Sequence, residues 1–135
     1  DLADEALDVA RQRLGIRGSR VQWLAADVTR ADLPNAAYDL WHDRAVLHFL
    51  VDPDAAAADA AQVRRCLVPG GHAVIGGFAP GGPERCSGLV VARRSPRDVA
   101  ALLGPGFSLV GEASEDHHTP SGATQAFSWA VLKRI

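Results

Sequence analysis

The sequence predicts an α/β domain whose mostly parallel sheet ends in an antiparallel hairpin. Over most of the 135 residues, short apolar segments rich in strand-forming residues alternate with segments of helical periodicity. The last two predicted strands, in contrast, are separated only by a turn that contains proline and glycine. Parallel neighbours require a crossover that is usually a helix, whereas a short turn joins antiparallel neighbours. A single domain over residues 1–135 accounts for this order.

Helix signals mark three segments: residues 3–14, residues 53–68 and residues 95–103. Asp1 or Asp4 is expected to cap the first helix, and Gly15 to end it. The second begins at Asp52-Pro53, a cap followed by a proline, and ends at Pro69-Gly70-Gly71. The third starts with a serine cap, a proline and an acid three residues after the serine.

Strand signals mark five short apolar segments: residues 21–26, 38–41, 72–78, 107–115 and 125–133. The first two are predicted to be buried, because they are nearly continuous apolar runs. Residues 79–88 contain too many glycines and prolines for regular structure and are predicted to form a loop.

Composition excludes several classes of protein. The formal charge of −2 and the pI near 6.2 lack the basic excess of a nucleic-acid-binding domain. No apolar run approaches the ~20 residues that cross a bilayer, and the acidic start does not resemble a signal peptide, so a cytoplasmic protein is expected. Cys66 and Cys86 are expected to be reduced and to bind no metal. The sequence has no methionine, so we expect an upstream segment.

Three motifs occur in a characteristic order. They are Ala25-Ala26-Asp27-Val28, Tyr38-Asp39-Leu40-Trp41-His42-Asp43-Arg44 and Leu67-Val68-Pro69-Gly70-Gly71-His72. Together they resemble the third strand, the fourth strand and the entry to the fifth strand of class I S-adenosylmethionine-dependent methyltransferases. That family has a Rossmann-like fold with a terminal antiparallel hairpin. The resemblance covers the C-terminal two-thirds of the family's domain, and the glycine-rich turn after the first strand is not in this chain.

The resemblance implies S-adenosyl-L-methionine as cofactor and assigns residues to it. Asp27 and Val28 would meet the adenine, and Asp1-Leu2 stand where an acid binds the ribose hydroxyls. His42 would line the methionine end of the cofactor. Asp43 would face the acceptor and either orient it or take its proton. The family's strand order, 3-2-1-4-5-7-6, implies that residues 21–26 either have no ladder partner here or have collapsed onto residues 38–41.

Each of these residues has a structural alternative. Asp43 could cap the next helix and pair with Arg44 in solvent, and Asp27 could form a turn before Thr29. Asp1, as a terminal residue, could be disordered. His48 lies on an apolar segment and is interpreted as a packed histidine rather than a base.

Other chemistry-bearing residues carry weaker signals. Adjacent strand residues point to opposite faces, so His117 and His118 are not expected to share a metal ion. Cys86 is interpreted as a loop thiol. The loop around it, residues 79–94, is where acceptor specificity is expected.

The predicted function is methyl transfer from S-adenosylmethionine to a small molecule or a protein side chain. Two alternatives stay open at this point: a truncated Rossmann-like interaction domain without activity, and a nicotinamide-dependent oxidoreductase.

Overall fold

The computed structural model describes residues 1–135, which form two compact units, residues 1–32 and 33–135. The first unit contains α1 (Asp4–Leu14) and a 3-10 turn, η1 (Gly15–Arg20). The predicted cap is wrong, because Ala3 occupies the N-cap position without a side-chain cap bond, and the Asp1 side chain accepts from the amide of Ala3 instead. Gly15 does end the α-helix, with a positive φ of 53°, but the chain continues directly into η1.

Residues 21–26 do not form the predicted buried strand. No ladder includes them, and Val21 and Leu24 are exposed. A strand is stabilised by a ladder of hydrogen bonds to a neighbour, whereas the backbone bonds of this segment are one to Gly18 and a short pairing with Asp1. The expectation that it has no ladder partner, which follows from the family's strand order, agrees with this geometry.

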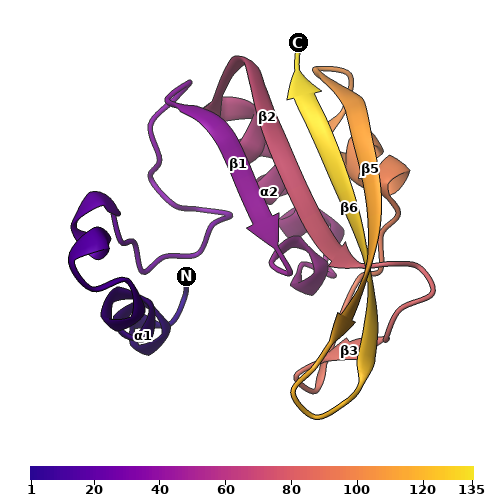
Figure 1. Cartoon of the computed structure of the whole chain (residues 1–135). Helices are drawn as coiled ribbons and strands as arrows, with labels where there is room; N and C mark the ends of the chain where they lie inside the picture. Colours follow the sequence, from indigo (N-terminus) through magenta and orange to yellow (C-terminus); the bar gives the residue numbers. More distant parts are fainter. The chain divides into compact units, whose positions relative to one another are not determined.

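The second unit is built on a four-stranded sheet whose order is β1-β2-β6-β5 (Figure 1). Its strands are β1 (Tyr38–Arg44), β2 (Leu67–Phe78), β5 (Phe107–His118) and β6 (Thr124–Arg134). Strands β1 and β2 are parallel, whereas β6 pairs antiparallel with both β2 and β5. The α/β class, the Rossmann-like order and the C-terminal hairpin are confirmed. Strand β6 forms antiparallel ladders with both β2 and β5, so β1–β2 is the one parallel pairing of this four-stranded sheet.

Two helices carry the predicted start signals. Helix α2 (Pro53–Cys66) is capped by the Asp52 side chain, which accepts from the Asp54 backbone. Helix α3 (Pro96–Leu103) begins with a reciprocal capping box between Ser95 and Asp98. Between β1 and α2 lies a short 3-10 turn, η2 (Leu47–Phe49). None of the helices is long and apolar enough to span a membrane.

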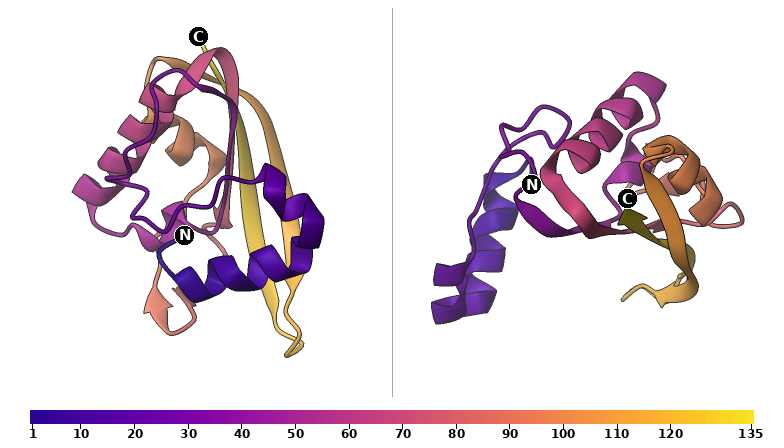
Figure 2. Two further views of the ribbon diagram at one scale, coloured as in Figure 1. Left: turned by 90° about the vertical axis from the view of Figure 1, so that its left-hand side faces the viewer. Right: turned by 90° about the horizontal axis from the view of Figure 1, so that it is seen from above.

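Both helices of this unit lie on the same face of the sheet (Figure 2). The main core joins apolar residues of α2 and α3 to the strand residues on that face: Ala60, Val63, Leu103, Ala73, Ile75, Ala130 and Leu132. The prediction that β1 is buried on both faces is wrong, because Leu40 on the opposite face is 57% exposed. Helices of this unit cover one face of the sheet only.

Two glycines shape the first part of β2, just after α2. Gly70 has a φ of 82°, a conformation that favours glycine. A side chain on Gly71 would come within 2.9 Å of the Val68 carbonyl and 3.0 Å of the Asp39 carbonyl. The β1–β2 register shifts at this joint, between Tyr38 and Leu40. The motif thus lets the chain leave the helix and enter the sheet beside β1.

The predicted loop after β2 contains a small hairpin. Strands β3 (Arg85–Cys86) and β4 (Leu89–Val90) pair antiparallel around Ser87 and Gly88, both with positive φ. The loop folds back, since Val91 packs with Phe78 and Phe127 in a second apolar cluster.

Candidate functional site

The carboxyl ends of β1 and β2 define the edge where an open α/β sheet binds ligands. Arg44, the last residue of β1, lies opposite Gly76 on β2, and Gly76 lies opposite Trp129 on β6. The loop after β2 and the far half of the β5–β6 hairpin extend beyond this edge (Figure 1). Side chains from several segments therefore meet where the parallel strands end.

In the first unit, Asp1 pairs with the segment that precedes Asp27. The Asp1 amino group donates to the Leu24 carbonyl at 3.1 Å, and the Ala26 amide donates to the Asp1 carbonyl at 2.9 Å. This is the bonding pattern of two parallel strands, with Asp1 opposite Ala25. It places Asp1 beside the segment that leads into Asp27, as neighbouring parallel strands ending in acids would. Leu2, also expected to contact cofactor, is 78% exposed.

The Asp27 carboxylate is held by a turn. Its Oδ1 accepts from the amide of Thr29 at 2.9 Å and from the hydroxyl of Thr29 at 2.7 Å. These bonds, together with Arg30, lower the pKa of Asp27. The turn-forming alternative is therefore present in the structure. The second oxygen, Oδ2, meets only the exposed Arg30, at 3.3 Å, and is free to accept from a ligand. Val28 is partly buried next to it.

The Asp43 carboxylate caps the turn that follows β1. Its two oxygens accept from the amides of Val46 at 2.9 Å and Leu47 at 3.0 Å, and the residue is 5% exposed. Burial raises the pKa of Asp43, against the opposite effect of these two bonds. The geometry favours the capping alternative over direct contact with an acceptor. The expected ion pair with Arg44 is not formed, because Arg44 points to the other face of the sheet, toward Phe127.

His42 is exposed on the face of β1 opposite Asp43, with its ring centre 5.9 Å from that of Trp129. His42 and Asp43 are therefore adjacent in sequence but serve different faces of the sheet. His42 keeps an accessible ring at the ligand-binding edge, as the predicted cofactor contact requires.

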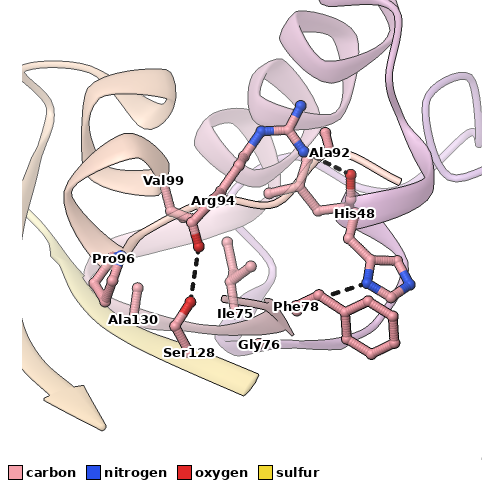
Figure 3. A pocket seen from close by; sticks show the side chains of 12 residues that line it. His48, Ile75, Gly76, Phe78, Ala92, Arg94, Pro96, Val99, Ser128 and Ala130 are labelled. Carbon is pink, nitrogen blue, oxygen red and sulfur yellow. Dashed lines mark hydrogen bonds between the residues drawn. The ribbon is translucent and has the colours of Figure 1, made fainter. Parts of the chain in front are cut away.

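His48 is a packed histidine, as its apolar neighbours indicate. It is 3% exposed, and its ring makes edge contacts with Phe49 and Phe78. The Phe78 amide donates to its Nδ1 at 3.4 Å (Figure 3), while the buried Nε2 has no partner. Burial, together with the nearby charge of Arg94, lowers the pKa of His48, which favours the neutral ring. The adjoining void of about 10 Å³ holds about one water molecule and is too small for a substrate.

Arg94 joins the loop after β2 to the turn after β1. Its guanidinium donates to the carbonyls of Leu47 and Leu50, both at 2.9 Å. The Ser128 hydroxyl donates to the Arg94 carbonyl at 2.7 Å (Figure 3). The 79–94 loop, where specificity was expected, is thereby fixed to the ligand-binding edge. Sequence patterns did not identify this tether, because its partners are backbone atoms more than 40 residues away.

Asp59 is a second residue that the sequence analysis missed. It is 1% exposed on α2, and neither carboxylate oxygen has a hydrogen-bond partner. Burial, reinforced by the charge of Asp43, raises the pKa of Asp59 to about 7, although Arg94 acts in the opposite direction. A signal was available: Asp59 follows Ala56 by three residues and precedes Val63 by four, which puts it on the apolar stripe.

The remaining candidates lie apart from one another. His117 contacts Arg44, with 3.4 Å between Nδ1 and Nη2, whereas His118 contacts Thr124. The two histidines thus have separate partners, as strand alternation requires. Cys86 is partly buried in β3 and packs against the second apolar cluster.

Comparison with known proteins identifies the family. Residues 1–71 match the sequence profile of a methyltransferase domain. A search of curated protein sequences found no match. The matched region includes Asp1 and Asp27, all of β1 and α2, and the start of β2.

Solved structures share the whole fold. The N-methyltransferase NodS from Bradyrhizobium japonicum WM9 is 23% identical, with a TM-score of 0.79 over 99% of this chain and 70% of its own. A SAM-dependent methyltransferase from Methanosarcina mazei is 12% identical, with a TM-score of 0.77 over 100% of this chain and 80% of its own.

A third structure, of 1,6-didemethyltoxoflavin-N1-methyltransferase from Burkholderia thailandensis, is 24% identical, with a TM-score of 0.71. This chain covers 59% of that protein and 64% of NodS in its complex with S-adenosyl-L-homocysteine. It therefore spans less than two-thirds of the length of some of its relatives. Together, the profile match and the shared fold show that the chain belongs to the methyltransferase domain family, with the fold of the S-adenosylmethionine-dependent enzymes.

Proposed function

We propose that the protein transfers a methyl group from S-adenosyl-L-methionine to a small-molecule acceptor. The observation that carries this proposal is the sheet order β1-β2-β6-β5, in which an antiparallel strand lies between β2 and β5. This order corresponds to strands four, five, seven and six of the methyltransferase fold. Nicotinamide-dependent Rossmann domains lack the antiparallel hairpin, so nothing in the structure favours the oxidoreductase alternative.

The residues present fit the proposed cofactor. Asp1 pairs in a parallel-strand pattern with residues 24–26, which lead into Asp27, and each of the two acids keeps a carboxylate oxygen beyond the one used by its local turn. Carboxylates accept hydrogen bonds from ribose hydroxyls and from an adenine amino group. We propose that Asp1 with Leu2 binds the ribose, that Asp27 with Val28 binds the adenine, and that His42 lines the methionine end. The glycine-rich turn would be supplied by a segment upstream of Asp1, in which case residues 1–135 are a partial domain.

When bound, S-adenosylmethionine supplies a methyl group on a sulfonium, which is an excellent leaving group. The protein's contribution is therefore mainly proximity and alignment. Asp43 would contribute by fixing the turn after β1, because its two oxygens hold the Val46 and Leu47 amides. A carboxylate close to the sulfonium would stabilise the ground state more than the transition state. The burial of Asp43 on the face opposite His42, which is proposed to line the methionine end, therefore suits the reaction. We assign Asp43 a positioning role on these grounds.

Calorimetric titration of the full protein with S-adenosylhomocysteine and, separately, with NAD tests the proposal. Methyltransferase function predicts binding of S-adenosylhomocysteine and no heat from NAD. Binding of NAD alone would support an oxidoreductase, and binding of neither would support an interaction domain.

A further inference from the structure

We propose that Arg44, His42, His117 and Trp129 form the acceptor site, and that the acceptor is a planar aromatic acid. This inference rests on the methyl-transfer function proposed above and names the substrate class of that site. The four side chains, called here the Trp129 platform, come from β1, β5 and β6.

The Trp129 platform lies at the ligand-binding edge, on the face that α2 and α3 leave uncovered. Trp129 alternates along β6 with Ala130, which is part of the helix-covered core, so Trp129 points to the opposite face. Gly76 lies between Arg44 and Trp129 in the register of the sheet. Because Arg44 is the last residue of β1, the platform is where strands of this fold present ligand-binding groups.

The floor of the platform is a fixed aromatic surface. A side chain on Gly76 would come within 2.5 Å of the Trp129 ring, so the indole lies directly on the glycine backbone. The indole Nε1 donates to Glu115 at 2.8 Å, which fixes the orientation of the ring. Phe127 stacks beside it, with ring centres 6.3 Å apart at an angle of 25°. Trp129 is only partly buried, which leaves ring surface for a flat ligand.

The positive charge at the platform belongs to Arg44. Its guanidinium lies 5.0 Å over the Phe127 ring and 3.4 Å from Nδ1 of His117. The ion pairs of the chain involve Arg11, Arg30 and Arg93, so the charge of Arg44 has no carboxylate partner. An exposed, planar guanidinium held beside an aromatic surface is suited to bind a carboxylate or phenolate.

An aromatic acid satisfies both parts of this surface at once. Its ring would stack on Trp129 between His42 and Phe127, and its anionic group would pair with Arg44.

An ionised acceptor also suits the residues around the site. Its oxygen attacks the methyl carbon, a C–O bond forms, and the C–S bond breaks with its electron pair going to sulfur, which becomes a neutral thioether. No proton has to be removed from an oxygen that is already ionised. This agrees with the state of the two nearby candidate bases. The Asp43 oxygens already accept backbone hydrogen bonds, and the His48 ring is packed against Phe78.

Binding of simple probes tests the inference. The full protein, saturated with S-adenosylhomocysteine, is titrated with benzoate, neutral benzamide and non-aromatic cyclohexanecarboxylate, and binding is followed by ligand-observed NMR. We expect benzoate to bind about fivefold tighter than either of the other two, a difference near 1 kcal/mol for each lost contact. Equal affinity for benzoate and benzamide would overturn the proposal.

Variants assign the preference to residues. Arg44→Gln should abolish the preference for benzoate over benzamide, and Trp129→Leu the preference for benzoate over cyclohexanecarboxylate. Arg97→Gln, an exposed arginine on α3, is the matched control and should change neither. Arg44 is exposed, so its variant keeps the test valid even if Trp129→Leu unfolds. An Arg44→Gln protein that retains the preference overturns the proposal. If the wild-type protein did not bind S-adenosylhomocysteine but still preferred benzoate, the result would instead refute the proposed function.

Discussion

Replacing Asp59 by asparagine should stabilise the protein above pH 7 and have little effect near pH 4. Asp59 is buried with both carboxylate oxygens unpartnered, and its pKa is raised from 3.8 to about 7. Because the folded state holds the proton more tightly than the unfolded chain, stability falls as pH rises from the unfolded pKa through the folded one. The shift corresponds to at most about 4 kcal/mol at pH 8.5. Asparagine has no charge to bury, so the variant should lack this loss.

Urea unfolding of the full protein, followed by tryptophan fluorescence at several pH values between 4 and 8.5, measures the effect. The wild type should lose stability over this interval relative to Asp59→Asn, and the gain of the variant should be about 2–4 kcal/mol at pH 8.5, since its amide stays unpartnered. Asp54→Asn, on an exposed position of the same helix, is the matched control and should not remove the pH dependence. A parallel pH dependence of the wild type and Asp59→Asn would refute the assignment of a buried carboxylate at this position.

Three further predictions follow from individual contacts. Asp27→Ala should weaken S-adenosylhomocysteine binding by about tenfold or more in calorimetry, because adenine polar groups lose their partner; unchanged affinity would leave Asp27 as a turn residue only. Asp43→Ala should lower the free energy of unfolding by about 1–2 kcal/mol, the value of a side-chain cap, and a loss below about 0.3 kcal/mol would contradict the capping role. Arg94→Gln should destabilise by about 1–3 kcal/mol through two lost bonds to carbonyls, whereas the exposed Arg93→Gln should cost less than about 1 kcal/mol. Equal losses in these two arginine variants would show that the tether does not stabilise the loop.

The elements predicted best from the sequence are those whose start or turn is specified by a motif of a few consecutive residues. The starts of α2 and α3 follow from Asp52-Pro53 and from the Ser95 capping box, and both form as expected. The turn between β5 and β6 follows from Pro120 and Gly122, the latter with a φ of 87°. Such local geometry depends on backbone preferences that the sequence states directly.

The errors concern features that depend on distant parts of the chain. Residues 21–26 have the composition of a buried strand, but composition does not supply a hydrogen-bonding neighbour. The exposure of Leu40 depends on which face of the sheet the helices cover. For Asp43, the sequence left a choice between capping and an acceptor role; the bonds to Val46 and Leu47 show the cap, and the acceptor role stays a prediction. The Trp129 platform required the β2–β6 register, which no local pattern contains.

Hydrogen–deuterium exchange of the full protein with and without S-adenosylhomocysteine would locate the cofactor on the chain. We expect slower exchange at residues 1–3 and 26–29, and at residues 41–48 where β1 ends, with no change in α3. Residues 26–29 are the most informative, because their backbone forms a turn with few bonds of its own. Protection confined to α3 and the β5–β6 hairpin, or no protection at a saturating concentration of S-adenosylhomocysteine, would contradict the claim that this chain forms part of a methyl-transfer site.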